Sequence, residues 1–117
     1  MAEEIEKELA DLRKIQKEVG KLESMRQDYI LKKHENDMVK EEFDQLQDEE
    51  SKVYKLIGPA LISQSLSEAK NTVDKRLEFI TKEITRLEKL KEDFLKKAEE
   101  KQTKIMQLQK SIAARGK

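Results

Sequence analysis

Apolar residues in the C-terminal half of the chain recur in alternating steps of four and three, from residue 73 to residue 112. Ten of these twelve positions are apolar, and the two exceptions are lysines. Steps that average 3.5 residues keep one stripe of a helix against a partner helix, which is typical of a coiled coil. We call this stripe the seam. Its positions are Val73, Leu77, Ile80, Ile84, Leu87, Lys91, Phe94, Ala98, Lys101, Ile105, Leu108 and Ile112.

The N-terminal half carries a weaker seam of the same kind. Its period averages slightly under 3.5 residues, and polar residues interrupt it at Lys32 and Asn36. Asn36 has two interpretations, because a polar seam residue can fix the register of a coiled coil or can simply be tolerated at some cost in stability. The seam positions are Ile5, Leu9, Leu12, Ile15, Val19, Leu22, Met25 and Tyr29, followed by Lys32, Asn36, Val39, Phe43 and Leu46.

Between the two seams the helical period stops, and the pattern predicts a β-hairpin over residues 50–64. Residues 51–57 are rich in β-branched and aromatic side chains, which favour strands. Gly58 and Pro59 form a turn dipeptide, and Ser65 with Glu68 has the capping-box spacing that begins a helix. The expected fold is mainly α, an antiparallel two-helix coiled coil joined by one β-hairpin. Helices over 1–49 and 65–117 and the hairpin over 50–64 would form one domain.

The predicted hairpin has apolar side chains on both of its faces. A hairpin that lies on the surface of a helical pair needs only one apolar face, and an isolated hairpin leaves two unpaired edges and is marginally stable. We therefore expect it to join strands from other chains in a larger sheet or barrel. The residues predicted to mediate this assembly are Val53, Tyr54, Leu56, Ile57, Gly58, Pro59, Leu61 and Ile62.

Composition and charge support an elongated helical class that folds back on itself. Charged residues make up 43% of the 117 positions and apolar ones only 36%, too few for an ordinary compact core. Residues 1–65 carry a net charge of about −5 and residues 66–117 about +5, so the two arms attract each other. We expect antiparallel pairing in which the numbers of facing residues add up to about 114.

Candidate chemistry is sparse, and the sequence predicts no enzyme, no metal site and no cofactor. There is no cysteine, no glycine-rich phosphate loop and only one histidine, His34, which lies among lysines and glutamates as a solvated residue does. A net charge of zero leaves no electrostatic footprint for nucleic acid. The N-terminus lacks the apolar run of a signal peptide, and no stretch is apolar enough for a membrane span, so we expect a soluble cytoplasmic protein.

A family resemblance appears in the middle of the chain. The segment VYKLIGPAL at residues 53–61, with the downstream groups at 68–70, 73, 75–77 and 79–80, resembles the β-type subunits of prefoldin. The groups at 35–36 and 39–42 are similar as well, so the specific match covers about residues 35–80. Ile62 and Ser63 stand where the family has Val-Lys, a departure that leaves the strand alternation intact.

The resemblance implies a subunit of a hexameric, ATP-independent co-chaperone. In such complexes two α-type and four β-type subunits join through their hairpins, capture unfolded or nascent polypeptides such as actin and tubulin, and deliver them to the cytosolic chaperonin. Expected partners are thus other prefoldin subunits, unfolded clients and the chaperonin. The alternative function is a structural coiled-coil tether or rod subunit without chaperone activity, which would show the same seam.

The free end of the predicted coiled coil is the candidate client-binding surface. Helix ends fray because their last backbone groups lack intrahelical partners, and fraying there would expose apolar side chains to a client. The same residues would otherwise simply close the coiled coil, and the sequence leaves both possibilities open. The candidates are Ile5, Leu9, Leu12, Ile105, Met106, Leu108 and Ile112.

Overall fold

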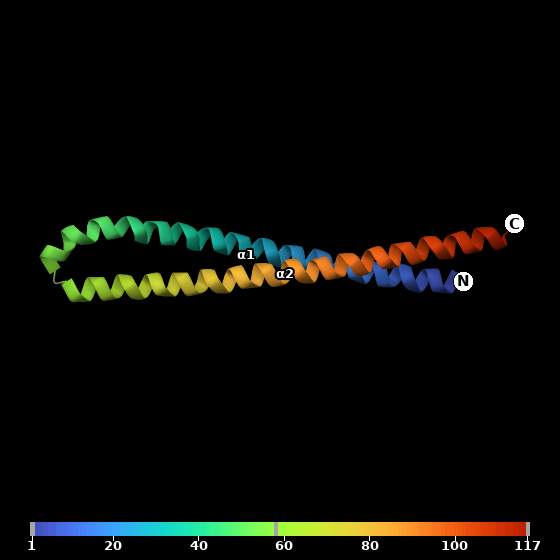
Figure 1. Ribbon diagram of the computed structural model, residues 1–117, viewed down its shortest axis with the longest axis horizontal. Coiled ribbons are helices and arrows are strands. Elements are labelled where there is room, and N and C mark those ends of the chain that lie inside the picture. Colours follow the sequence, from blue (N-terminus) through green and yellow to red (C-terminus); the bar gives the residue numbers. More distant parts are fainter. Residues whose placement is uncertain (1, 58, 117) are drawn as a thin grey trace. The chain divides into compact units, whose positions relative to one another are not determined.

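The chain forms two long helices. The computed structural model describes the backbone of residues 2–57 and 59–116, and the side chains of residues 2–46 and 66–116. Helix α1 is Ala2–Ile57 and helix α2 is Pro59–Arg115 (Figure 1). The chain divides into two compact units, each built from one part of either helix. Unit 1 comprises Met1–Arg26 and Arg86–Lys117, and unit 2 comprises Gln27–Thr85.

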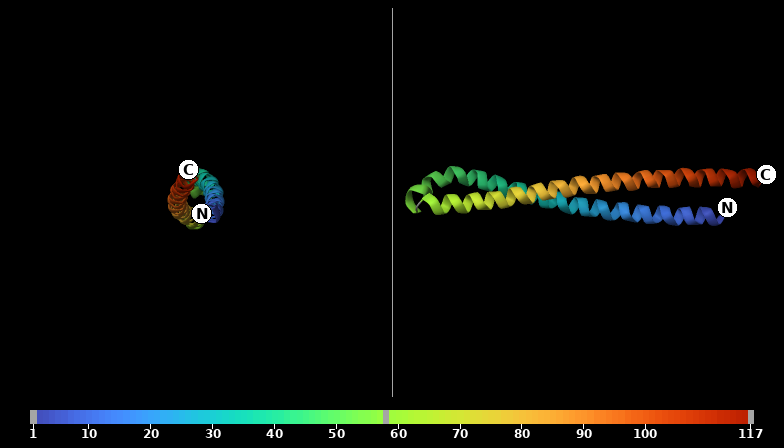
Figure 2. Two further views of the ribbon diagram at one scale, coloured as in Figure 1. Left: turned by 90° about the vertical axis from the view of Figure 1, so that its right-hand side faces the viewer. Right: turned by 60° about the horizontal axis from the view of Figure 1, so that its bottom comes forward.

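Unit 1 pairs the N-terminal part of α1 with the C-terminal part of α2 in antiparallel orientation, and the right-hand view of Figure 2 shows the two segments side by side. Its core is a cluster of Leu12, Ala98 and Ile105, against which Leu9 and Ile15 pack. These residues all occupy seam positions, so burial of this stripe holds the two segments together.

Unit 2 pairs the remaining part of α1 with the N-terminal part of α2, also antiparallel. Val73 and Ile80 of α2 are buried, whereas every described side chain of residues 27–46 is half-buried or exposed. The α1 segment is the one in which polar residues interrupt the sequence period. The helical contact in unit 2 is consequently less completely apolar than that in unit 1.

The predicted seam of α2 is confirmed. Eleven of its twelve positions are buried or half-buried, and only Ile112, at 37% exposed, opens to solvent. The predicted register of about 114 is confirmed as well, because four ion pairs between the helices join residues whose numbers add up to 114, and those of Lys101 and Lys104 add up to 109–112. The four pairs are Glu23–Lys91 and Arg26–Glu88 in unit 1, and Lys40–Asp74 and Asp44–Lys70 in unit 2.

The structure does not show the predicted β-hairpin. Residues 50–57 belong to α1 and residues 59–64 to α2, and no strand occurs among the residues whose backbone is described. A helix satisfies its backbone groups within one segment, whereas strands need partners that a single chain lacks here. Pro59 is compatible with this arrangement because proline is well tolerated at the first position of a helix. The capping-box pattern at Ser65 accordingly lies inside α2 instead of at its start.

Candidate functional site

The predicted client-binding residues all lie in unit 1, where both chain ends are found (Figure 1). Six of them are seam positions, and five of these six are covered: Leu12 and Ile105 are buried, and Ile5, Leu9 and Leu108 are half-buried. Met106 is 57% exposed and Ile112 is 37% exposed. The structure thus brings the set together in one unit, with the two exposed members on α2.

A charged cluster lies beside these apolar residues. Glu8 is only 6% exposed, and its Oε2 lies 2.8 Å from Nζ of Lys101, while Lys104 donates a hydrogen bond of 3.1 Å to Oε1. Asp11 is a second partner of Lys101, at 3.5 Å. We call these four residues the Glu8 cluster. A carboxylate so deeply placed needs its cationic partners, because burial alone would favour the neutral acid.

Charge pairing sets the protonation states in the Glu8 cluster. The ammonium of Lys101, and after it that of Lys104, holds the pKa of Glu8 below its usual value, although partial burial opposes this effect. Glu8 in turn raises the pKa of Lys101. Both shifts favour the ionised pair at neutral pH, so the cluster fastens α1 to α2 among the apolar seam residues.

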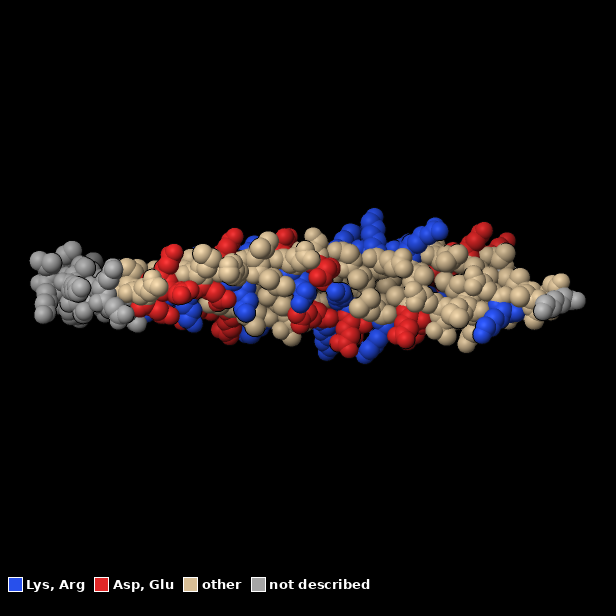
Figure 3. All heavy atoms as spheres, turned by 90° about the horizontal axis from the view of Figure 1, so that it is seen from above, with Lys and Arg blue, Asp and Glu red and all other residues tan. Residues whose placement is uncertain are grey.

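The second lysine in the α2 seam is paired in the same way. Lys91 lies 2.8 Å from Oε2 of Glu23, and Arg26 bridges Glu23 and Glu88 at 3.3 and 3.1 Å. Lys91, and to a smaller extent Arg26, lowers the pKa of Glu23. Each lysine that interrupts the apolar seam of α2 therefore meets a carboxylate of α1. Figure 3 shows the resulting mixture of acidic and basic side chains over the face that it presents.

Sequence reasoning did not single out Glu8 or Glu23, although a signal was present. A lysine at a seam position requires an acid on the partner helix. Because the numbers of facing residues add up to about 114, only a few residues of α1 could supply that acid. Lys91 and Glu23 satisfy this sum, whereas Lys101 and Glu8 fall a few residues short of it. The pairing could thus have been predicted approximately once the register was known.

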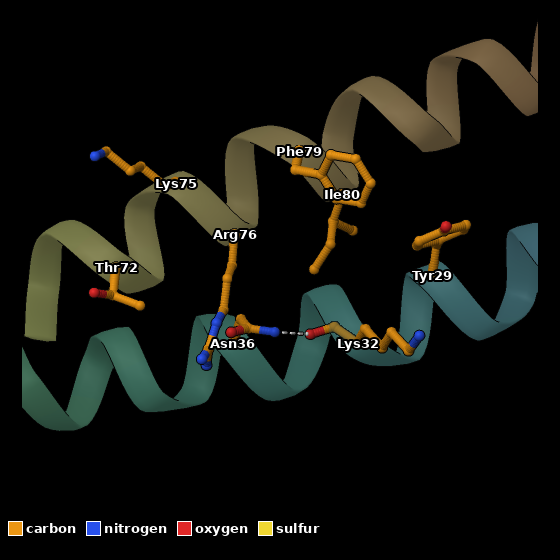
Figure 4. Close-up of a pocket in the computed structure, with 8 residues that line it drawn as sticks. All are labelled: Tyr29, Lys32, Asn36, Thr72, Lys75, Arg76, Phe79 and Ile80. Carbon is orange, nitrogen blue, oxygen red and sulfur yellow. Dashed lines mark hydrogen bonds between the residues drawn. The ribbon is translucent and has the colours of Figure 1, made fainter.

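Unit 2 contains a groove that the sequence analysis also missed (Figure 4). Its volume is about 530 Å³. The rings of Tyr29 and Phe79 meet edge to face across it, with centroids 6.5 Å apart, and Nζ of Lys32 lies 5.3 Å from the centroid of the Tyr29 ring. Polar residues at the α1 seam leave this space unfilled. The lining residues are Tyr29, Lys32, Asn36, Thr72, Lys75, Arg76, Phe79 and Ile80.

Asn36 makes a local contact in this groove. Its Nδ2 donates a hydrogen bond of 2.7 Å to the carbonyl of Lys32, one turn earlier in the same helix (Figure 4). Among the described residues it has no hydrogen bond to α2, and Arg76 merely extends toward it. A residue that fixes register needs a partner on the facing helix, so the structure favours the interpretation that Asn36 is tolerated.

The predicted assembly surface lies outside the side chains that the structure describes. The side chains of all eight predicted assembly residues fall within residues 47–65, outside the described ones. Within the described residues, no three histidine or acidic side chains gather as metal ligands would. Neither helix, over its described part, holds a stretch long and apolar enough to cross a membrane.

Comparison with known proteins decides the family. The sequence profile described as prefoldin subunit matches residues 6–112. The chain belongs to the prefoldin subunit family. Prefoldin subunit 6 of Arabidopsis thaliana is 41% identical over 93% of this chain and 84% of its own length. Prefoldin subunit 6 of Homo sapiens is 40% identical over 96% of this chain and 89% of its own. Probable prefoldin subunit 6 of Caenorhabditis briggsae is 45% identical over 92% and 83%. No solved structure matches the chain.

Membership in this family gives the paired helices a role. A prefoldin subunit is part of a protein-folding chaperone that contains further prefoldin subunits, and a coiled coil is the architecture that the described residues show. The resemblance seen at residues 35–80 is thereby confirmed and extends over nearly the whole chain.

Proposed function

We propose that the chain is one subunit of a hexameric, ATP-independent co-chaperone that captures unfolded or nascent polypeptides, including actin- and tubulin-like ones, and delivers them to the cytosolic chaperonin. The family supports the chaperone role. The observation that carries client capture is the exposure of Met106 beside the apolar seam of unit 1 and of Ile112 at the last position of that seam. Cytoplasmic localisation follows from the same proposal.

In the proposed client capture, apolar side chains of unit 1 contact the client, and fraying of the helix ends would expose more of these side chains. Met106 and Ile112 are available without any change of structure, and Ile5 and Leu108 are half-buried and close to the chain ends. Burial of such a side chain against a client contributes roughly 1.5–3 kcal/mol. Several weak sites in one complex can raise the overall affinity about 10²–10⁴-fold while each contact remains easily reversible. This combination suits a protein that holds many sequences and releases them.

Assembly would use the segment 50–64 as a β-hairpin between the helical segments 1–49 and 65–117. Its two apolar faces and strand-forming composition support a hairpin that forms when neighbouring subunits supply partner strands. Without those partners, helix is the alternative that satisfies the backbone. The proposed change of conformation is thus driven by strand pairing between chains.

The client-binding proposal is tested by changing only its exposed members. The double variant Met106→Lys and Ile112→Lys should assemble normally with partner subunits but suppress aggregation of an unfolded protein less well. Leu95→Lys is the matched control, because Leu95 is 48% exposed on the same helix but lies outside the proposed surface. Full protection by the double variant would show that clients bind elsewhere.

Removing residues 1–12 and 105–117 provides the more drastic test of the same surface. The truncated subunit should still enter the complex, since assembly depends on residues 50–64, but it should fail to protect unfolded clients. Protection equal to that of the full-length subunit would exclude the open end of unit 1 as the client site.

The assembly proposal needs a separate test. Leu56→Asp together with Leu61→Asp should leave the far-ultraviolet circular dichroism nearly unchanged and prevent co-purification with partner subunits. A structural tether without chaperone activity would instead form stable parallel dimers by itself, which gel filtration with light scattering would reveal.

A further inference from the structure

The groove of unit 2 combines an apolar wall with positively charged side chains. Phe79 is 57% exposed although its ring contacts Tyr29, and Ile80 forms the deeper apolar surface (Figure 4). An exposed apolar patch that is rimmed by polar residues is a mark of interaction sites and ligand-binding grooves. The volume of about 530 Å³ lies within the usual range for ligand pockets, and it can receive one or two side chains of a peptide.

The charged residues of this groove all have the same sign. Lys32, Lys75 and Arg76 line it together with the neutral side chains of Asn36 and Thr72, and none of the lining residues is a carboxylate. Elsewhere in unit 2, charged residues pair between the helices, as in Lys40–Asp74 and Asp44–Lys70. By contrast, no ion pair is formed by Lys32, Lys75 or Arg76 among the described residues.

The geometry points to a docking site for an acidic peptide segment that carries an aromatic or branched aliphatic anchor. The anchor would enter between Tyr29, Phe79 and Ile80, and flanking carboxylates would pair with Lys75 and Arg76. Such a segment gains charge-assisted hydrogen bonds without displacing an acid of this chain. Basic segments would meet three cations and be rejected. The proposed site goes beyond the client capture at the open end of unit 1 and does not depend on it.

Fluorescence anisotropy with three synthetic peptides tests the proposal on the full-length chain. The probe is a labelled hexapeptide of four carboxylate residues around one Phe and one Leu. One matched peptide has lysine in place of each acid, and the other has alanine in place of Phe and Leu. The acidic probe should bind at least about 10-fold more tightly than either matched peptide, and added salt should weaken it. Equal binding of the acidic and basic peptides would overturn the proposal.

Variants then locate the binding. Lys75→Glu with Arg76→Glu should raise the dissociation constant of the acidic probe about 10-fold, since two attractive pairs become repulsive, each changing affinity roughly 2–5-fold. Phe79→Ala should raise the dissociation constant of the acidic probe about 5-fold, because the anchor side chain would lose its contact with one of the two aromatic rings that line the groove. The matched control is Lys89→Glu, 14 residues and thus two heptads beyond Lys75 on the same helix, outside the groove. It should change the constant less than 2-fold.

Three outcomes distinguish this site from the alternatives. Wild-type affinity in the Lys75→Glu and Arg76→Glu variant would place the peptide elsewhere and overturn the proposal. Binding to the isolated chain but not to the assembled complex would also overturn it, because a neighbouring subunit would then cover the groove. Retained peptide binding in the Met106→Lys and Ile112→Lys variant would show that the groove acts independently of the proposed client site, whatever that variant does to aggregation.

Discussion

Leu87 is the most informative single position for testing how the two helices are held together. It is 1% exposed and occupies a seam position in α2, in unit 1. Leu87→Ala removes about three carbon groups from this buried position, which corresponds to about 2.4 kcal/mol of transfer free energy at about 0.8 kcal/mol each. A residual cavity adds to this value, and leucine-to-alanine changes in cores typically cost about 2–5 kcal/mol. The slightly better helix propensity of alanine offsets only a few tenths of a kcal/mol.

The predicted loss converts into a measurable shift of the melting temperature. An unfolding entropy of about 2.1 cal/mol/K per residue makes 1 kcal/mol equivalent to about 4 °C for a chain of this length. Leu87→Ala should therefore lower the melting temperature by roughly 8–20 °C. Circular dichroism at 222 nm would follow the helix content during heating, at one fixed chain concentration because assembly makes melting concentration-dependent.

Leu95→Ala is the matched control for this experiment. It is the same chemical change in the same helix and the same unit, but the Leu95 side chain is 48% exposed. Leu95→Ala should lose about half of the transfer free energy that Leu87→Ala loses, and it should leave no cavity. We therefore expect it to lower the melting temperature by only about 4 °C. Equal shifts for the two variants would refute the assignment of Leu87 to the buried contact between the helices.

Three further predictions follow from unit 1. The stabilisation by Glu8 should be present above the ordinary carboxyl pKa and be lost as the pH falls through its lowered folded pKa, so the difference in melting temperature between wild type and Glu8→Gln should vanish in acid. A difference that persists at pH 2 would contradict this. Ile5→Cys with Leu108→Cys should form an intramolecular disulfide under mild oxidation, whereas exclusively intermolecular cross-links on a denaturing gel would indicate another pairing. Gly20→Ala should raise the unfolding free energy by about 0.5–1 kcal/mol in urea titration, because the added Cβ meets no atom within 4 Å and glycine weakens a helix interior.

The candidate site was only partly predictable from the sequence. Seam residues such as Leu12 and Ile105 could be placed together because the apolar period and the antiparallel register suffice to pair them. The sequence could not show that Met106 and Ile112 remain open while Leu108 is half-buried, since exposure depends on how the facing helix covers them. The groove around Phe79 could not be predicted for a similar reason. It forms only where polar residues of α1, such as Asn36, lie opposite Phe79 and Ile80 of α2.

The sequence is enough to predict two helices, the stripe that α2 buries and the residues that face one another, although Met25, Val39 and Leu46 of the expected α1 stripe are exposed. These features depend on local periodicity and on charge, which act wherever the helices meet, and the ion pairs Glu23–Lys91 and Asp44–Lys70 agree with them. Tertiary structure decided how polar seam residues are accommodated. Lys101 is stabilised by the buried Glu8 carboxylate, whereas Asn36 bonds to its own helix and leaves a groove beside it. Over the described backbone of residues 50–57 and 59–64, it also decided against strands in the single chain, because a strand is stable only when another supplies its hydrogen bonds, whereas a helix supplies its own.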